Sequence, residues 1–185
     1  MKYIKFLIIL FISINTSIIA DSKQIIINEL NLEGKLIFIR HAYAPGGGDP
    51  INFNIKDCST QRNLNNAGKE QAKRIGNFFK ENNILIEKVY SSEWCRCKET
   101  ALVAFNNFEE KSFLNSFFSS KFEQNKNHQM KSLKEFIKNW NGKKNLVFVT
   151  HYVVISEILD YASLSGEVVV TDKDFKVIDT ITIPY

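Results

Sequence analysis

The sequence predicts an α/β fold, a three-layer α/β/α sandwich in which helices cover both faces of a mostly parallel central sheet. From about residue 31, short β-rich runs alternate with longer helical patterns, the order typical of βαβ units. Two of the runs, residues 36–39 and 146–149, are continuously apolar, as in strands that are buried on both faces of a sheet. The length of 185 residues suits one domain with a substantial core.

The individual elements follow from the hydrophobic periodicity. Residues 88–91 predict a third strand, and 168–170 with 175–183 predict a closing β hairpin. A last helix is expected to run through Ile155 and Leu159, and three others are predicted over residues 66–81, 95–105 and 130–140.

Two segments predict loops. Residues 46–50 are rich in glycine and end in proline, which favours a flexible loop. Residues 106–127 are irregular and rich in Phe, Ser and Asn, and long loops of this kind are usually functional lids or poorly ordered. Within this stretch we expect Phe113, Phe117 and Phe118 to pack in the core rather than to form a hydrophobic binding wall.

Residues 1–20 have the pattern of a secretory signal peptide. Lys2 and Lys5 precede an apolar stretch, and Ala20 is a small residue at a plausible cleavage site. The stretch of about 14 residues is short for a membrane span, which argues against an uncleaved anchor. The sequence therefore predicts an exported protein, periplasmic or secreted, with a mature domain over residues 21–185. After removal of the signal we expect no stable membrane span.

Charge and cysteine content limit the possible partners. The formal net charge of +4 is mild and the basic residues are spread along the chain, so we expect no nucleic-acid partner. Cys95 and Cys97 are too close in sequence for an easy mutual bridge. In an oxidising compartment we therefore expect Cys58 to pair with one of them, which leaves one free thiol. Cys-x-Cys supplies only two ligands, and no metal site or cofactor is predicted.

Histidines follow two of the predicted strands in the same way. Arg40-His41 follows one apolar run and Thr150-His151 the other, and ligands of open α/β sheets bind beyond the carboxyl ends of the strands. Arg96 lies in the first turn of a predicted helix, and Arg62 precedes another. If the two strands are neighbours, this edge of the sheet brings the histidines together with several arginines.

These residue types suit phosphoryl transfer. The planar fork of arginine binds phosphate oxygens two at a time, and neutral imidazole is a competent nucleophile near pH 7. A second, protonated histidine can donate hydrogen bonds to the phosphoryl oxygens as their charge builds up. Such a site requires no metal ion.

The chain also resembles the histidine phosphatase superfamily, or phosphoglycerate mutase-like family, in four blocks that follow the family order and cover nearly all of the mature domain. The blocks are Arg40-His41-Ala42, Gln61-Arg62-Asn63-Leu64 with Gly68, Gln71 and Ala72, Val89-Tyr90-Ser91-Ser92 with Arg96 and Glu99-Thr100-Ala101, and Val149-Thr150-His151. The resemblance implies a phosphoglycerate mutase-like fold, a phosphorylated His41, a phosphate pocket of Arg40, Arg96 and His151, and an assisting role for Arg62. The short length looks closest to small bacterial members, such as phosphohistidine phosphatases and exported phosphatases of unknown substrate. Ala42 stands where the family usually has glycine, and we interpret it as a branch variant.

The proton donor for the leaving group is open at this stage. Many relatives use a carboxylic acid from a variable loop, and the leading candidates are Asp49 in the glycine-rich loop and Glu123 in the irregular stretch. Tyr152 follows His151 where phytase-like relatives carry aspartate, which argues against that branch. Further candidates are Glu93, Glu109 and Glu110.

The function that these features predict is a metal-independent phosphomonoester hydrolase that works through a phosphohistidine on His41. Its partner would be a phosphorylated small molecule or a phosphoprotein. One alternative is a module that binds phosphorylated ligands with little or no turnover. Another is a phosphoglycerate mutase-type phosphotransferase, against which the exported location argues. The oligomeric state is left open.

Overall fold

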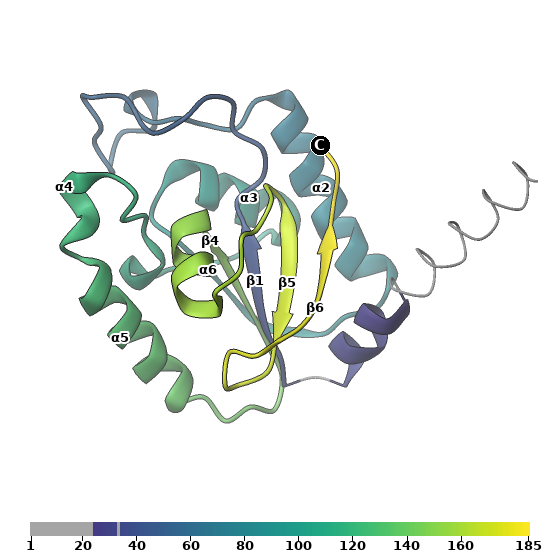
Figure 1. Ribbon diagram of the computed structural model, residues 1–185. Helices are drawn as coiled ribbons and strands as arrows, with labels where there is room; N and C mark the ends of the chain where they lie inside the picture. Colours follow the sequence, from purple (N-terminus) through teal and green to yellow (C-terminus); the bar gives the residue numbers. More distant parts are fainter. Residues whose placement is uncertain (1–23, 33) are drawn as a thin grey trace, which may run out of the picture.

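The computed structural model describes residues 24–32 and 34–185, which form a six-stranded sheet between two layers of helices (Figure 1). The predicted signal peptide, residues 1–20, lies outside the described residues. The strand order is β3-β2-β4-β1-β5-β6. The strands are β1 (Leu36–Arg40), β2 (Ile86–Ser91), β3 (Glu109–Glu110), β4 (Asn145–Thr150), β5 (Glu167–Thr171) and β6 (Val177–Thr182).

The sheet is mostly parallel, as the sequence predicts. The central strand β4 pairs in parallel with both β1 and β2, and β2 pairs in parallel with β3. The exceptions are β5, which is antiparallel to β1, and β6, which is antiparallel to β5, so that these two strands form the predicted closing hairpin. In the register of β1 and β4, Arg40 lies opposite Thr150, and the residue after each of these is a histidine.

Helices cover both faces of the sheet. One layer holds α2 (Asn66–Glu81), α3 (Cys95–Phe105) and the helical residues 24–31. The other holds α5 (Lys126–Lys138) and α6 (Tyr152–Leu159), and Figure 1 shows α5 and α6 on the side of the sheet opposite α2. The short helix α4 (Ser120–Glu123) precedes α5.

The alternation of side chains along β1 explains the three layers. Ile37 and Ile39 pack into the core on the α2 and α3 face, whereas Leu36 and Phe38 pack into the core on the α5 and α6 face. All four side chains are fully buried, because successive residues of a strand point to opposite faces of a sheet that is covered on both sides. The continuous apolar run is therefore explained by two separate cores.

Two elements differ from the sequence prediction. The helical residues 24–31 were not predicted, yet Ile26 and Leu30 are fully buried in the core. Helix α5 begins at Lys126 rather than at residue 130. Its first four residues are polar, so the hydrophobic periodicity starts only at Met130. The segment 106–127 is also more structured than expected, since it contains β3, a 3-10 turn (Ser112–Leu114) and α4.

None of the helices in residues 24–32 and 34–185 combines the length and the hydropathy that crossing a membrane requires.

Candidate active site

A cavity of about 830 Å³ opens at the carboxyl ends of β1 and β4. Because these strands are parallel neighbours, His41 and His151 emerge side by side, with their ring centroids 5.5 Å apart. The convergence predicted from the two strand ends is therefore confirmed. The polar side chains at this end of the cavity are Arg40, His41, Asp49, Arg62, Arg96 and His151.

His41 is held in one tautomer, with a hydrogen-bond partner at each ring nitrogen. Its Nδ1 lies 2.8 Å from the carbonyl oxygen of Ala42, an arrangement in which Nδ1–H donates to that oxygen. The tautomer then leaves the lone pair on Nε2, which accepts a hydrogen bond from Arg96 Nε at 3.1 Å. Burial, followed by the charge of Arg96, places the pKa of His41 well below its usual value. His41 is therefore neutral at pH 7, the state that a nucleophile requires.

His151 is held in the opposite tautomer, with the proton on Nε2. Its Nδ1 faces Arg96 Nη2 at 3.4 Å, and its Nε2 lies 2.9 Å from Ser92 Oγ. Since arginine can only donate, Nδ1 accepts and Nε2–H donates to the serine, whose own hydroxyl donates to Asn115 Oδ1 at 3.0 Å. Burial is also the largest cause that holds the pKa of His151 well below its usual value, ahead of Arg96 and His41.

Arg96 is the centre of the site. Its side chain is buried and lies between the two histidines, so that it donates to the nitrogen of each ring that faces the cavity. It also forms a two-point ion pair with Asp49, with Nη1–Oδ1 at 2.7 Å and Nη2–Oδ2 at 3.2 Å. The guanidinium is thus fixed in orientation on three sides before any ligand binds.

The two other arginines have different surroundings. Arg62 ties the glycine-rich loop in place, because its Nε donates to Gly48 O at 3.0 Å and its Nη1 donates to Ala44 O. Arg40 Nη1 donates to Ser163 O at 2.8 Å, while its buried Nε has no hydrogen-bond partner. Both side chains line the cavity, so they add positive charge on two further sides of His41.

The two leading candidates for the proton donor are not supported by their surroundings. Burial by itself raises the pKa of Asp49, but the hydrogen bonds and charge of Arg96 outweigh it, together with hydrogen bonds from the Arg62 amide and the Trp94 indole. The net pKa of Asp49 lies below its usual value, so this carboxylate is ionised and orients Arg96. Glu123 is exposed and does not line the cavity. These surroundings do not favour either residue as the proton donor, and the identity of the general acid stays a prediction.

The remaining carboxylate candidates also lie elsewhere. Glu93 accepts a hydrogen bond from Asn115, and Glu109 and Glu110 form ion pairs with lysines at the edge of the sheet. Across residues 24–32 and 34–185, Asp49 is the only carboxylate that lines the cavity.

A disulfide fixes the loop that carries Asp49. Cys58 is bonded to Cys95, which confirms the expected pairing of Cys58 with one of the two neighbouring cysteines. The bond joins the glycine-rich side of the cavity to the residue before Arg96. Cys97 is the free thiol, and it is buried with Sγ 3.5 Å from His151 Nε2. Burial raises the pKa of Cys97 to about 12, so it remains a neutral thiol.

The backbone after His41 is anchored from both sides. The Ala42 amide donates to Thr100 Oγ1 at 3.0 Å, and the Tyr43 amide donates to Gln71 Oε1 at 2.8 Å. The Ala42 side chain packs in a small buried cluster and does not line the cavity, so alanine in place of glycine does not narrow the cationic end of the cavity. Gly68 allows helix α2 to approach this backbone, since a Cβ there would lie 2.0 Å from Tyr43 O.

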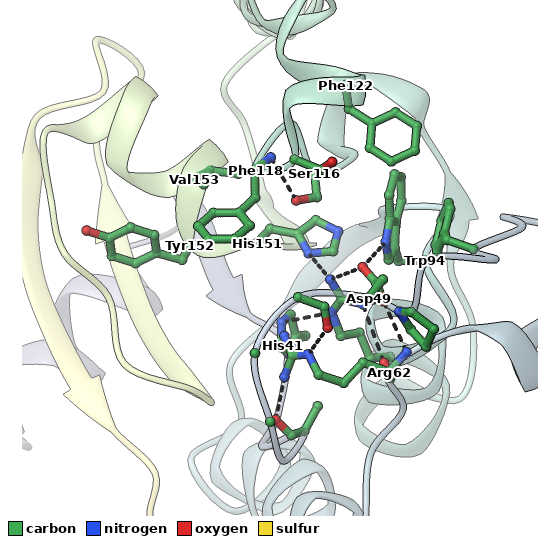
Figure 2. A pocket seen from close by; sticks show the side chains of 18 of the residues that line it. His41, Asp49, Arg62, Trp94, Ser116, Phe118, Phe122, His151, Tyr152 and Val153 are labelled. Carbon is green, nitrogen blue, oxygen red and sulfur yellow. Dashed lines mark hydrogen bonds and ion pairs between the residues drawn. The ribbon is translucent and has the colours of Figure 1, made fainter.

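The outer part of the cavity is mainly apolar. Figure 2 shows His151 between two groups of side chains, with Phe118, Tyr152 and Val153 on one side and Trp94 and Phe122 on the other. Phe117 is buried and Phe113 packs against the same core, as expected, but Phe118 is 71% exposed at the cavity mouth. The prediction of core packing is therefore wrong for Phe118.

Three rings form a wall between this cavity and a second one. Phe53 stacks on Trp94 with centroids 5.0 Å apart, and Phe122 contacts both edge-on at 5.6 Å. The three side chains, hereafter the aromatic wall, also line a neighbouring cavity of about 610 Å³.

Sequence reasoning missed several residues that position the site. Ser92 follows β2 at the same sheet edge as the histidines, so the strand-end argument that found His41 applies to it as well. Trp94 contacts His151 edge-on at 5.3 Å and donates to Asp49 Oδ2 at 3.0 Å. Nothing in its local sequence distinguishes it from a core tryptophan.

No group of three or more His, Cys, Asp or Glu side chains within the described part of the chain is arranged to hold a metal ion.

Comparisons with known proteins agree with this geometry. Residues 36–115 match the model of the histidine phosphatase superfamily (branch 1), a range that contains Arg40, His41, Arg62 and Arg96. No curated protein sequence matches the chain.

Solved structures share the fold at low identity. A putative phosphohistidine phosphatase SixA from Agrobacterium tumefaciens is 17% identical with a TM-score of 0.56, covering 80% of this chain and 97% of its own. A putative α-ribazole-5′-P phosphatase from Escherichia coli is 14% identical with a TM-score of 0.59, covering 81% of this chain and 97% of its own. Phosphoglycerate mutase from Thermus thermophilus is 14% identical with a TM-score of 0.55, covering 80% of this chain and 98% of its own. The match over residues 36–115 and the shared fold both support the resemblance to the histidine phosphatase superfamily that the sequence motifs indicate.

Proposed function

We propose that this protein is a metal-independent phosphomonoester hydrolase that forms a phosphohistidine on His41 Nε2 and acts outside the cytoplasm. The observation that carries the proposal is the state of His41. Its Nδ1–H is engaged by Ala42 O, so the lone pair lies on Nε2, and Nε2 faces a cavity that contains three arginines. A neutral nucleophile beside fixed positive charge suits attack on a phosphate dianion.

The first step transfers the phosphoryl group to the protein. As the Nε2–P bond forms, the bond between phosphorus and the leaving oxygen breaks, and that oxygen keeps the electron pair and takes a proton from water. The equatorial oxygens are held by Arg96, Arg40 and Arg62. Arg96 then donates to these negatively charged oxygens instead of to the two histidine nitrogens.

The second step releases phosphate. A water molecule attacks the phosphorus, the Nε2–P bond breaks, and the water proton is lost to solvent, so that His41 returns to its neutral state. His151 lies 5.5 Å from His41, between centroids, and in its protonated form donates to a phosphoryl oxygen in both steps.

Export rests on two features of the chain. Residues 1–20 have the signal pattern, and the Cys58–Cys95 disulfide is of a kind that persists in oxidising compartments. Cell fractionation with amino-terminal sequencing tests this. A mature protein that begins after Ala20 in the periplasm or medium supports export, and an intact amino terminus in the cytoplasm contradicts it.

The catalytic proposal is tested on the oxidised mature protein with an aryl phosphate in the presence of a chelator. We expect turnover and, after an alkaline quench, a phosphate-labelled protein, because the P–N bond of a phosphohistidine is stable to alkali and is cleaved by acid. His41→Ala abolishes both. The matched control is His128→Asn, because His128 is exposed and does not line the cavity of the histidines. Turnover that survives in His41→Ala would overturn the proposal.

One observation favours a second candidate, a module that binds phosphorylated ligands without turnover. The carboxylate in the described cavity, Asp49, is ion-paired and unsuited to donate a proton. Vanadate affinity that depends on Arg96, without a labelled phosphoprotein, would select this candidate over the hydrolase.

A further inference from the structure

We infer that the substrate of this site is an aryl phosphate, a phosphoryl group carried on the oxygen of an aromatic ring. The inference rests on the proposed hydrolase function and names the substrate class. Two independent observations support it, the apolar outer wall of the cavity and the chemistry available to the leaving group.

The first observation is the sharp division of the cavity. Its inner end is cationic, with three arginines beside the two histidines. Its outer part is mainly apolar, with Ile51, Phe53, Trp94, Phe118, Phe122 and Tyr152 in its lining. The segment that supplies Phe118 and Phe122 also contributes Ser116, Ser119 and Lys121 to the lining. Ile51 and Phe118 are among the most exposed large apolar residues of the described chain. Exposed apolar groups that gather at a cavity mouth indicate a ligand surface.

The apolar part of the cavity begins close to its cationic end. The Trp94 ring lies 5.3 Å from the His151 ring, and the His151 ring lies 5.5 Å from that of His41, all between centroids. The apolar surface therefore begins one ring away from the phosphoryl position. A phosphosugar would place hydroxyl groups against these apolar rings, which offer them no hydrogen-bond acceptors. A flat ring bonded directly to the phosphate oxygen instead meets aromatic edges and faces.

The second observation concerns the leaving oxygen. Asp49 is held ionised by Arg96, and no other carboxylate among residues 24–32 and 34–185 lines the cavity. An alkoxide departs poorly without a strong proton donor. A phenolate departs readily, because the pKa of a phenol is about 10, as for tyrosine, and its charge spreads into the ring.

The reaction is balanced without a carboxylic acid. His41 Nε2 bonds to phosphorus, the bond from phosphorus to the aryl oxygen breaks, and the phenolate leaves with the electron pair and gains a proton from water. Hydrolysis of the phosphohistidine then consumes one water and releases inorganic phosphate. Overall, the aryl phosphate and water give a phenol and phosphate.

The test compares three substrates on the oxidised mature protein: phenyl phosphate, octyl phosphate and glycerol phosphate. We expect kcat/KM for phenyl phosphate to exceed that for either alkyl ester by roughly 100-fold, the order of a missing general acid. Equal or better hydrolysis of octyl phosphate, dependent on His41, would overturn the aryl assignment and leave the hydrolase intact. Failure of all three substrates would remove the hydrolase function itself.

A variant tests the apolar wall directly. Phe118→Ala should raise KM for phenyl phosphate roughly three- to tenfold, the order of one lost aromatic contact, while the inhibition constant of inorganic phosphate stays unchanged. Phe118 is largely exposed, so the fold does not depend on it. The control is Leu85→Ala, an exposed apolar residue that lines none of the cavities described here. An unchanged KM in Phe118→Ala, or an equal change for inorganic phosphate, would refute the assignment.

Discussion

Asp49 and Arg96 form a two-point ion pair inside the cavity, with both carboxylate oxygens bound to the guanidinium at 2.7 and 3.2 Å. The pair aligns Arg96 so that its Nε and Nη2 face the two histidines. In the proposed reaction the carboxylate is therefore a positioning residue, which acts through the arginine that it orients.

Asp49→Asn separates this positioning role from proton donation. Without the charge, Arg96 loses its alignment, and we expect kcat/KM to fall roughly tenfold, the order of one charge-assisted hydrogen bond. A positioning role predicts the same loss for substituted phenyl phosphates of any leaving-group pKa. Glu123→Gln is the control and should be neutral, because Glu123 is exposed outside the cavity. A loss that grows with leaving-group pKa would instead identify Asp49 as the proton donor.

Binding of a phosphate analogue should take up a proton at His151. The pKa of His151 is well below its usual value in the free protein, so the ring is neutral at pH 7, whereas a bound dianion favours the imidazolium. The complex then holds more protons than the free protein, and vanadate affinity falls as pH rises. Calorimetry in buffers of different ionisation enthalpy measures the uptake. His151→Asn should abolish it, and a binding enthalpy independent of buffer would contradict the assignment.

Reduction of the Cys58–Cys95 disulfide should destabilise the protein. The bond closes a loop with a sequence separation of 37, for which the chain-entropy relation gives about 4 kcal/mol in the free energy of unfolding. Urea unfolding with and without reductant measures the difference. The double variant Cys58→Ser/Cys95→Ser should not respond to reductant. Thiol counting on the denatured, unreduced protein should find only Cys97, and three thiols would show that the bond is absent.

Gly68→Ala should destabilise the fold. The added Cβ would lie 2.0 Å from the backbone oxygen of Tyr43, so helix α2 or the segment after His41 must move. We expect the free energy of unfolding to fall by about 1–3 kcal/mol, the usual cost of overpacking. Gly47→Ala is the control, because nothing lies within 4 Å of its added Cβ. Equal unfolding midpoints for both variants would show that the backbone yields without cost.

Most of the fold is predictable because its signals are local. The apolar runs at Leu36 and Leu146 indicate buried strands, and their common ending in histidine places the site at the carboxyl edge of the sheet. The start of α5 is not visible in the same way, because Lys126 and the next three residues are polar and helical without hydrophobic periodicity.

The site is only partly predictable, since charge pairing depends on contacts distant in sequence. Asp49 and Arg96 are 47 residues apart, and their ion pair favours a positioning role for a carboxylate that the sequence alone suggests as a proton donor. Phe118 differs from the buried Phe117 only in the direction of its side chain, which composition cannot supply. Residue type identifies the chemistry, and the tertiary contacts decide which group performs it.

The aromatic wall limits the space available to a substrate, whereas histidines and arginines line the inner end of the cavity. Its three rings close one end of the cavity, and a further cavity of about 610 Å³ lies directly behind them. Phe122 lines both cavities, so a smaller residue at this position would enlarge the space on each side of the wall. The size of the space is therefore set by residues other than the histidines and arginines at the inner end of the cavity.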